Sequence, residues 1–130
     1  MNKKIFLISG MAATALAALG LFGYLNHSMN SAEVIRKLSG IRMAGGLFRL
    51  EKGRPPSGIG ELISSGNLEA APELKLRMHR TSSKVRNASV LTVADTGGWA
   101  YVNDPKSPDY GTFFIDCSHT DEKDRYWSWF

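Results

Sequence analysis

The side chains best suited to chemistry lie near the end of the chain, in residues 116–124. Their oxygen atoms are the ligands that hard cations prefer, and they belong to Asp116, Ser118, Thr120, Asp121 and Asp124. Calcium takes about six to eight such oxygens. The pattern predicts a calcium site formed by Asp116, Ser118, Asp121 and Asp124. It is not an EF-hand loop, because the glycine and the final glutamate of that loop are missing. The alternative is a hydrogen-bonded turn without a metal.

His119 stands two positions before Asp121, and such a pair is suited to acid–base chemistry or to zinc binding. The other two histidines are far away in the sequence, so we interpret His119 as lacking a set of metal ligands. An enzyme would need Asp95, Asp116, His119 and Asp121 to converge in one pocket. We therefore predict a protein without catalytic residues and with no cofactor other than calcium.

Charge and cysteine content exclude some classes of function. The formal net charge is +4, and two of these charges are Lys3 and Lys4. The remaining excess is too small to predict a nucleic-acid-binding protein. Cys117 is the only cysteine, so the fold cannot depend on a disulfide within the chain. It is expected to be a buried free thiol or to pair between chains.

An uncharged apolar run over residues 5–25 is the first element that must position these groups. About 20 helical residues span roughly 30 Å of hydrocarbon, so the run predicts a transmembrane helix, with residues 1–29 as the anchor. Lys3 and Lys4 precede it, which favours a cytoplasmic N-terminus. The predicted arrangement is a single pass through a membrane, with residues 30–130 as a domain outside the cytoplasm. The alternative is a cleaved signal peptide.

Small side chains recur at four-residue spacing within this run. They are Gly10, Thr14 and Ala18 on one line and Ala13 and Ala17 on another. Membrane helices approach one another closely over such positions, so these residues are predicted to pack against neighbouring helices. The alternative is that alanine is merely common in segments of this kind.

A second helix is predicted from residue 30 to about residue 50. Asn30 and Glu33 have the spacing of a capping box. An apolar stripe at helical intervals follows, formed by Val34, Leu38, Ile41 and Phe48 and widened by Ile35, Ala44 and Leu47. The helix begins at this cap or continues the apolar run as a single rod. Gly45 and Gly46 predict close packing near its far end.

Three strands are predicted in the second half of the chain. Residues 89–94 and 98–102 alternate around a turn and read as a hairpin, and residues 112–116 form the third strand. Residues 74–78 also permit a short edge strand. The predicted fold is α+β, with the long N-terminal helix laid across a small antiparallel sheet of about three strands.

Residues 47–72 resemble the segment that follows the long helix in type IV pilins and type II secretion pseudopilins. The shared pattern, in order, is Phe48, Gly53, Pro56, Glu61-Leu62, Gly66, Leu68 and Pro72, and Gly97-Gly98-Trp99 with Tyr101 adds to it. The resemblance implies a pilin-like fold and a non-enzymatic structural subunit, minor or atypical, of a secretion pseudopilus or pilus-like filament. Its implied partners are other pilin-like subunits and assembly proteins, and its implied location is a bacterial inner membrane, with residues 30–130 in the periplasm or in an extracytoplasmic filament. Major pseudopilins use a loop similar to residues 116–130 for calcium.

The resemblance also bears on the two ends of the chain. Pilins are cut after a glycine, which corresponds here to Gly10 followed by Met11, but Ala15 stands where the family carries a glutamate. At the other end Trp127, Trp129 and Phe130 fold back on the sheet or form a surface for a partner. The alternative function is a signal-anchored monomeric envelope protein that uses a pilin-like domain to bind a ligand or partner.

Overall fold

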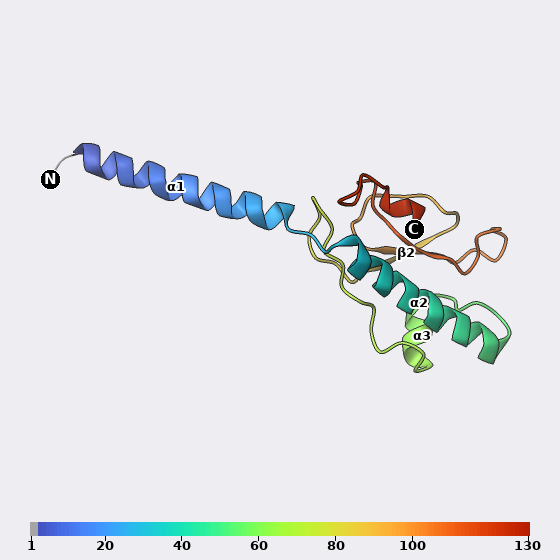
Figure 1. Ribbon diagram of the computed structural model, residues 1–130. Coiled ribbons are helices and arrows are strands. Elements are labelled where there is room, and N and C mark those ends of the chain that lie inside the picture. The colour runs from blue at the N-terminus through green and yellow to red at the C-terminus, as the bar shows by residue number, and fades with distance from the viewer. Residues whose placement is uncertain (1–2) are drawn as a thin grey trace.

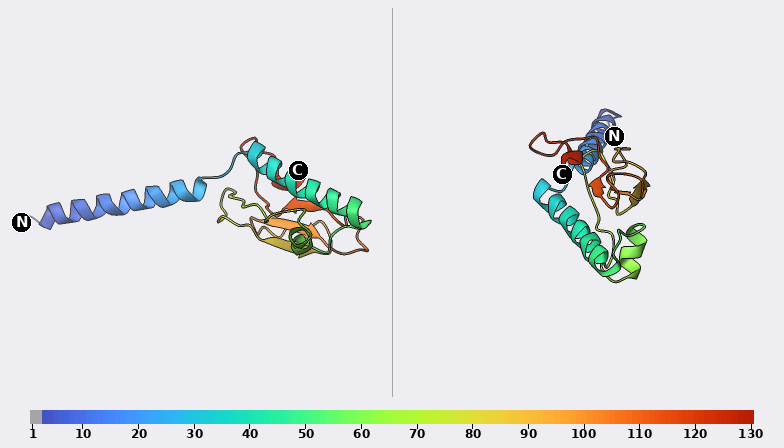
Figure 2. Two further views of the ribbon diagram at one scale, coloured as in Figure 1. Left: turned by 90° about the horizontal axis from the view of Figure 1, so that it is seen from below. Right: turned by 90° about the vertical axis from the view of Figure 1, so that its right-hand side faces the viewer.

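The computed structural model describes residues 3–130, with side chains for residues 10–24 and 27–130. Its elements are α1 (Lys3–Asn26), α2 (Ser31–Lys52), α3 (Ile59–Ser64), β1 (Val85–Ala88), β2 (Trp99–Val102), β3 (Phe113–Ile115) and the 3-10 turn η1 (Trp127–Trp129). The elements from α2 onward form a small α+β domain, and α1 extends away from that domain (Figures 1 and 2).

The first two helices are separated by residues 27–30, so the single-rod alternative is wrong. Asn30 has an extended backbone, and its side chain accepts a 2.9 Å hydrogen bond from the Glu33 N–H, which confirms the predicted cap. The Met29 N–H donates to the Lys75 carbonyl at 2.8 Å. The chain between the helices is therefore fixed to the domain by hydrogen bonds instead of continuing the helix.

The predicted stripe of α2 forms the core of the domain. Its fully buried members are Val34, Leu38, Ile41, Ala44 and Phe48. Leu47 was expected to widen the stripe but is 49% exposed. A Cβ on Gly45 would lie 3.5 Å from the Phe113 ring, so the predicted close packing is confirmed there. Gly46 has open space around it.

The sheet has the order β1-β2-β3 and is mixed. β2 and β3 are antiparallel, with Trp99 opposite Ile115 and Tyr101 opposite Phe113. β1 runs parallel to β2, with Val85 opposite Trp99. The predicted antiparallel sheet is therefore wrong for this pair, and residues 89–94 are a loop between β1 and β2. Residues 74–78 contribute one bridge, from Leu74 to Ser82, instead of an edge strand.

A buried carboxylate explains why residues 89–98 do not form a hairpin. The Ala94 N–H and the Thr96 hydroxyl both donate to Asp116, at 2.6 and 2.7 Å. Arg86 of β1 donates to the same carboxylate at 2.8 Å. These donors satisfy Asp116, which is fully buried, and the backbone N–H of Ala94 is therefore not available for a ladder between strands.

Both faces of the sheet are covered. Trp99, Tyr101, Phe113 and Ile115 pack with the α2 stripe, while Ala100, Val102 and Phe114 pack with Val93 on the other side. Figure 2 shows α2 lying along one face of the strands. Two of the buried rings find backbone partners, because the Trp99 indole donates to the Pro72 carbonyl and the Tyr101 hydroxyl to that of Pro56, whereas the buried Trp127 indole N–H has no partner among the described residues.

The predicted location in a membrane is contradicted. Among the described residues, no helix combines the length and the apolar character that crossing a membrane requires. The predicted single pass through a bacterial inner membrane is therefore wrong.

Candidate functional site

α1 presents a mostly apolar surface that the domain does not cover. All side chains of residues 10–24 are exposed, and the large ones include Met11, Leu16 and Phe22 at 71%, 70% and 67%. The hydroxyl of Thr14 donates to the carbonyls of Gly10 and Met11, so this polar atom is already satisfied within the helix. A helix that is apolar on all sides needs a cover from outside the domain.

The residues predicted to pack against other helices all lie on this exposed part of α1. They are Gly10, Ala13, Thr14, Ala17 and Ala18. The contact between α1 and the domain is at its C-terminal end, where the Lys75 ammonium lies 5.0 Å from the centre of the Tyr24 ring. Cleavage between Gly10 and Met11 stays a prediction.

The two best candidate calcium ligands are bound to arginines instead. Burial acts to raise the pKa of Asp116, but the hydrogen bonds from Arg86, Ala94 and Thr96 outweigh it and hold that pKa below its usual value. Asp121 accepts two hydrogen bonds from the Arg125 guanidinium, at 2.6 and 2.9 Å. Each of these carboxylates therefore has a cation already.

The other two predicted calcium ligands do not complete a site. The Ser118 N–H donates to Asp95 at 2.8 Å, and Asp124 is exposed at a turn that its N–H closes on the Asp121 carbonyl. In the described part of the chain, Asp116, Asp121 and Asp124 do not form a converging group of carboxylates. The calcium site stays a prediction that this geometry does not support.

The loop that carries these residues is fastened to the start of α2. The Glu122 carboxylate accepts hydrogen bonds from the N–H of Ser31, at 3.1 Å, and from its hydroxyl. The side-chain hydrogen bond from Ser31 lowers the pKa of Glu122. A negative charge at this point also complements the positive end of the helix dipole.

The aromatic tail divides into a buried and an exposed part. Trp127 is 2% exposed and belongs to the core, so it folds back as one alternative predicted and cannot serve as a partner surface. Trp129 is 71% exposed, with its ring 5.1 Å from that of Tyr126. Phe130 is partly buried under the Arg125 guanidinium. Trp129 and Phe130 remain available as the predicted surface.

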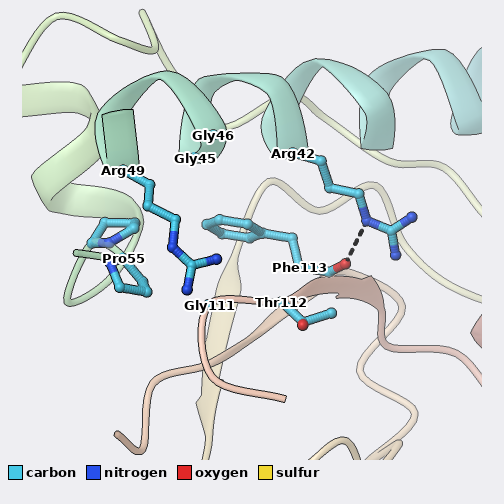
Figure 3. A pocket seen from close by; sticks show the side chains of 9 residues that line it. Arg42, Gly45, Gly46, Arg49, Pro55, Gly111, Thr112 and Phe113 are labelled. Carbon is cyan, nitrogen blue, oxygen red and sulfur yellow. Dashed lines mark hydrogen bonds between the residues drawn. The ribbon is translucent and has the colours of Figure 1, made fainter. Parts of the chain in front are cut away.

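A pocket of about 220 Å³ lies where the second half of α2 faces the start of β3. Figure 3 shows Arg49 extending into it between Pro55 and the Phe113 ring. Arg42 borders the same space and donates to the Phe113 carbonyl at 3.0 Å, and burial lowers its pKa. No carboxylate is among the residues that line the pocket, so it is suited to a small anionic group.

A group of four potential metal ligands was missed at the sequence level. His79, Asp95, Cys117 and His119 bring one ligand atom each to a space where these atoms lie within 4.8 Å of one another. They come from the loop around residues 74–82, the β1–β2 loop and the segment after β3. Burial raises the pKa of the Cys117 thiol to about 11.

The interatomic distances in this group are short. His79 Nε2 lies 3.2 Å from His119 Nδ1 and 3.2 Å from Asp95 Oδ1, while His119 Nδ1 lies 3.5 Å from the same oxygen. Cys117 Sγ is 3.4 Å from His79 Nε2 and 3.5 Å from His119 Nδ1. The signal available in the sequence was the pair Cys117 and His119, two residues apart at the end of a strand.

Comparisons of the chain with protein-family models, with curated proteins and with solved structures find no match.

Proposed function

We propose that the chain is a non-enzymatic structural subunit that assembles through α1 into a pilin-like filament, of the kind formed by type II secretion pseudopilins and type IV pilins. The observation that carries this proposal is the exposed apolar surface of α1 beside a domain whose own core is complete. An assembly subunit needs such a division, because one part must remain folded while the other binds neighbours.

The energetics of α1 favour association. Its large exposed side chains are Met11, Leu16, Leu19, Leu21, Phe22 and Tyr24, each 60–71% exposed. Fully burying a side chain of this size contributes about 1.5–3 kcal/mol, so covering most of these surfaces contributes roughly 5–10 kcal/mol per chain. This is comparable to the roughly 8 kcal/mol of a micromolar complex, before the costs of association are subtracted.

The partner that best fits α1 is another copy of α1. Residues 5–25 contain no charge, so nothing on this surface selects a partner of opposite charge. Ala13, Ala17 and Ala18 leave room for a second backbone to approach closely. Contacts of this kind repeat from one copy to the next in a filament when the rotation between subunits does not close a ring.

Light scattering and electron microscopy of the full chain test this proposal. We expect the full chain to form extended assemblies and the double variant Leu16→Asp/Leu19→Asp to be monomeric, because a charge on α1 cannot be buried without a partner. Leu50→Asp is the matched control, since Leu50 is 85% exposed on α2, and it is expected to assemble normally. A monomeric full chain, or equal assembly of the double variant, would refute the proposal.

A monomeric binding domain is the second candidate, and the pocket beside Arg42 and Arg49 favours it. On this alternative the full chain is monomeric and binds a short peptide through the peptide's terminal carboxylate. Arg49→Gln is then expected to weaken that binding by about tenfold, a loss of roughly 1.4 kcal/mol. Calorimetric titration of the full chain measures this effect.

A further inference from the structure

Four side chains around one point satisfy the chemistry of a zinc site. The ligand atoms are His79 Nε2, His119 Nδ1, Cys117 Sγ and Asp95 Oδ1. Zinc in proteins is bound by histidine nitrogen, cysteine sulfur and carboxylate oxygen, with four ligands in a tetrahedron at structural sites. Calcium and magnesium take oxygen ligands instead, so the thiol and the two imidazoles exclude them as the preferred ions.

Five of the six distances between these atoms agree with a tetrahedron, and the sixth, between the Cys117 sulfur and the Asp95 oxygen, is within 4.8 Å. Zinc–nitrogen bonds of about 2.0–2.1 Å place two nitrogens about 3.3–3.4 Å apart, and a zinc–sulfur bond of about 2.3 Å places sulfur and nitrogen about 3.6 Å apart. The two imidazole nitrogens are 3.2 Å apart, and the two sulfur–nitrogen distances are 3.4 and 3.5 Å. The nitrogen–oxygen distances of 3.2 and 3.5 Å also agree with tetrahedral coordination of one zinc ion.

Hydrogen bonding alone does not account for this arrangement. His79 Nε2 faces three polar atoms at once, on Asp95, Cys117 and His119. A ring nitrogen carries at most one hydrogen, so one N–H cannot serve all three contacts. A cation at the centre satisfies every lone pair together, and its two positive charges balance one thiolate and one carboxylate. The proton of the thiol passes to water when the ion binds.

The surroundings hold the ligands in place. The Ser118 N–H donates to Asp95 Oδ1, and the His119 N–H donates to the Cys117 sulfur. Gly97 has φ 74°, and a Cβ there would collide with the His79 ring, so glycine is what lets the β1–β2 loop approach this imidazole. Partners that orient metal ligands in this way are typical of metal centres.

We propose that His79, Asp95, Cys117 and His119 bind one structural zinc ion, which joins the loop around residue 79, the β1–β2 loop and the segment after β3. All four positions are filled by protein groups, which is the arrangement of structural sites and leaves no position for a substrate. The ion takes the place of the disulfide that a chain with one cysteine cannot form. The site does not depend on assembly through α1.

Metal analysis of the full chain is the first test. We expect about one zinc ion per chain after removal of excess metal with a weak chelator. Cobalt substituted for zinc is expected to give the intense visible bands of a tetrahedral ion and a near-ultraviolet band from the thiolate. A weak octahedral cobalt spectrum, or no retained metal, would overturn the proposal.

Single variants identify the ligands. Cys117→Ser is expected to abolish the thiolate band and to weaken zinc binding by more than about 100-fold. This is the upper end of the effect of losing a group that only hydrogen-bonds to a metal ligand, and loss of the ligand itself should cost more. His119→Gln and Asp95→Asn are expected to weaken binding similarly, and both side chains are 40% exposed, so the core is undisturbed. Asparagine also accepts the left-handed backbone of Asp95, φ 60°.

The control is a histidine outside the group. His27 is exposed between α1 and α2, and His27→Gln is expected to leave both the zinc content and the cobalt spectrum unchanged. Undiminished zinc in properly folded His119→Gln and Asp95→Asn would refute the assignment even if Cys117→Ser failed to fold. If His27→Gln lost as much zinc as the ligand variants, the metal would be bound at scattered surface groups, and the proposed site would be overturned as well.

Discussion

Substitutions at the two ends of the ion pair between Arg86 and Asp116 are expected to lower the free energy of unfolding by different amounts. Asp116 is fully buried and Arg86 is 30% exposed, with their closest atoms 2.8 Å apart. Arg86→Met leaves a buried carboxylate without its cation, whereas Asp116→Asn leaves a guanidinium that still reaches water. The arginine substitution is therefore expected to be the more damaging of the two.

The expected losses of unfolding free energy follow from the hydrogen-bond partners that remain in each variant. After Arg86→Met the carboxylate keeps the Ala94 N–H and the Thr96 hydroxyl, so we expect a loss of about 3 kcal/mol, the lower end for breaking a buried pair. Asp116→Asn keeps one acceptor oxygen and a similar shape, and its expected cost is about 1.5 kcal/mol. The double variant Arg86→Met/Asp116→Asn should lose about 1–3 kcal/mol less free energy of unfolding than the two single variants added together.

Urea unfolding followed by tryptophan fluorescence measures these values. All proteins are compared with a strong chelator present, because Asp116 adjoins Cys117 and metal binding would otherwise contribute. Arg80→Met is the control, since Arg80 is exposed, and its effect is expected to stay within about 0.5 kcal/mol. If Asp116→Asn proved more damaging than Arg86→Met, the argument from burial would be wrong.

Three further predictions concern the rest of the domain. Gly46→Ala is expected to raise the free energy of unfolding by about 0.5–1 kcal/mol, because the site is helical with open space around it; a decrease in the urea midpoint would contradict this. The hydrogen bond from Arg54 lowers the pKa of Glu61 to about 2, so its stabilising effect is present above the unfolded pKa and is lost as pH falls through about 2. Thermal midpoints of wild type and Glu61→Gln should accordingly differ at neutral pH and converge in acid. Glu122→Gln removes the charge that faces Ser31 at the start of α2 and should cost about 0.5–1 kcal/mol by urea unfolding, an effect that added salt reduces.

Local signals predicted α2 well. The cap at Asn30 and the stripe from Val34 to Phe48 are both properties of adjacent turns, so periodicity alone identifies them. The positions of β2 and β3 were also predicted closely. The strand β1, which pairs with β2, was not predicted, because residues 89–94 alternate like a strand, while the hydrogen bond of the Ala94 N–H depends on Asp116, far along the chain.

The candidate metal centre could not be read from the sequence, since its ligands are spread over residues 79–119 and no short spacing unites them. His119 has no second histidine near it in the sequence, and the turn after residue 76 brings His79 to it in the fold. The acidic residues near the end had the more obvious pattern for a metal. Two of them, Asp116 and Asp121, are instead paired with arginines.

Lys75 belongs to both halves of the molecule. Its carbonyl accepts from Met29 at the helix break, its ammonium lies over the Tyr24 ring of α1, and the same ammonium donates to the carbonyl of His79. A movement of the backbone at residue 79 would therefore move the ammonium group that contacts the Tyr24 ring of α1. Through this one lysine, the orientation of α1 relative to the domain is expected to depend on the conformation of the loop around residue 79.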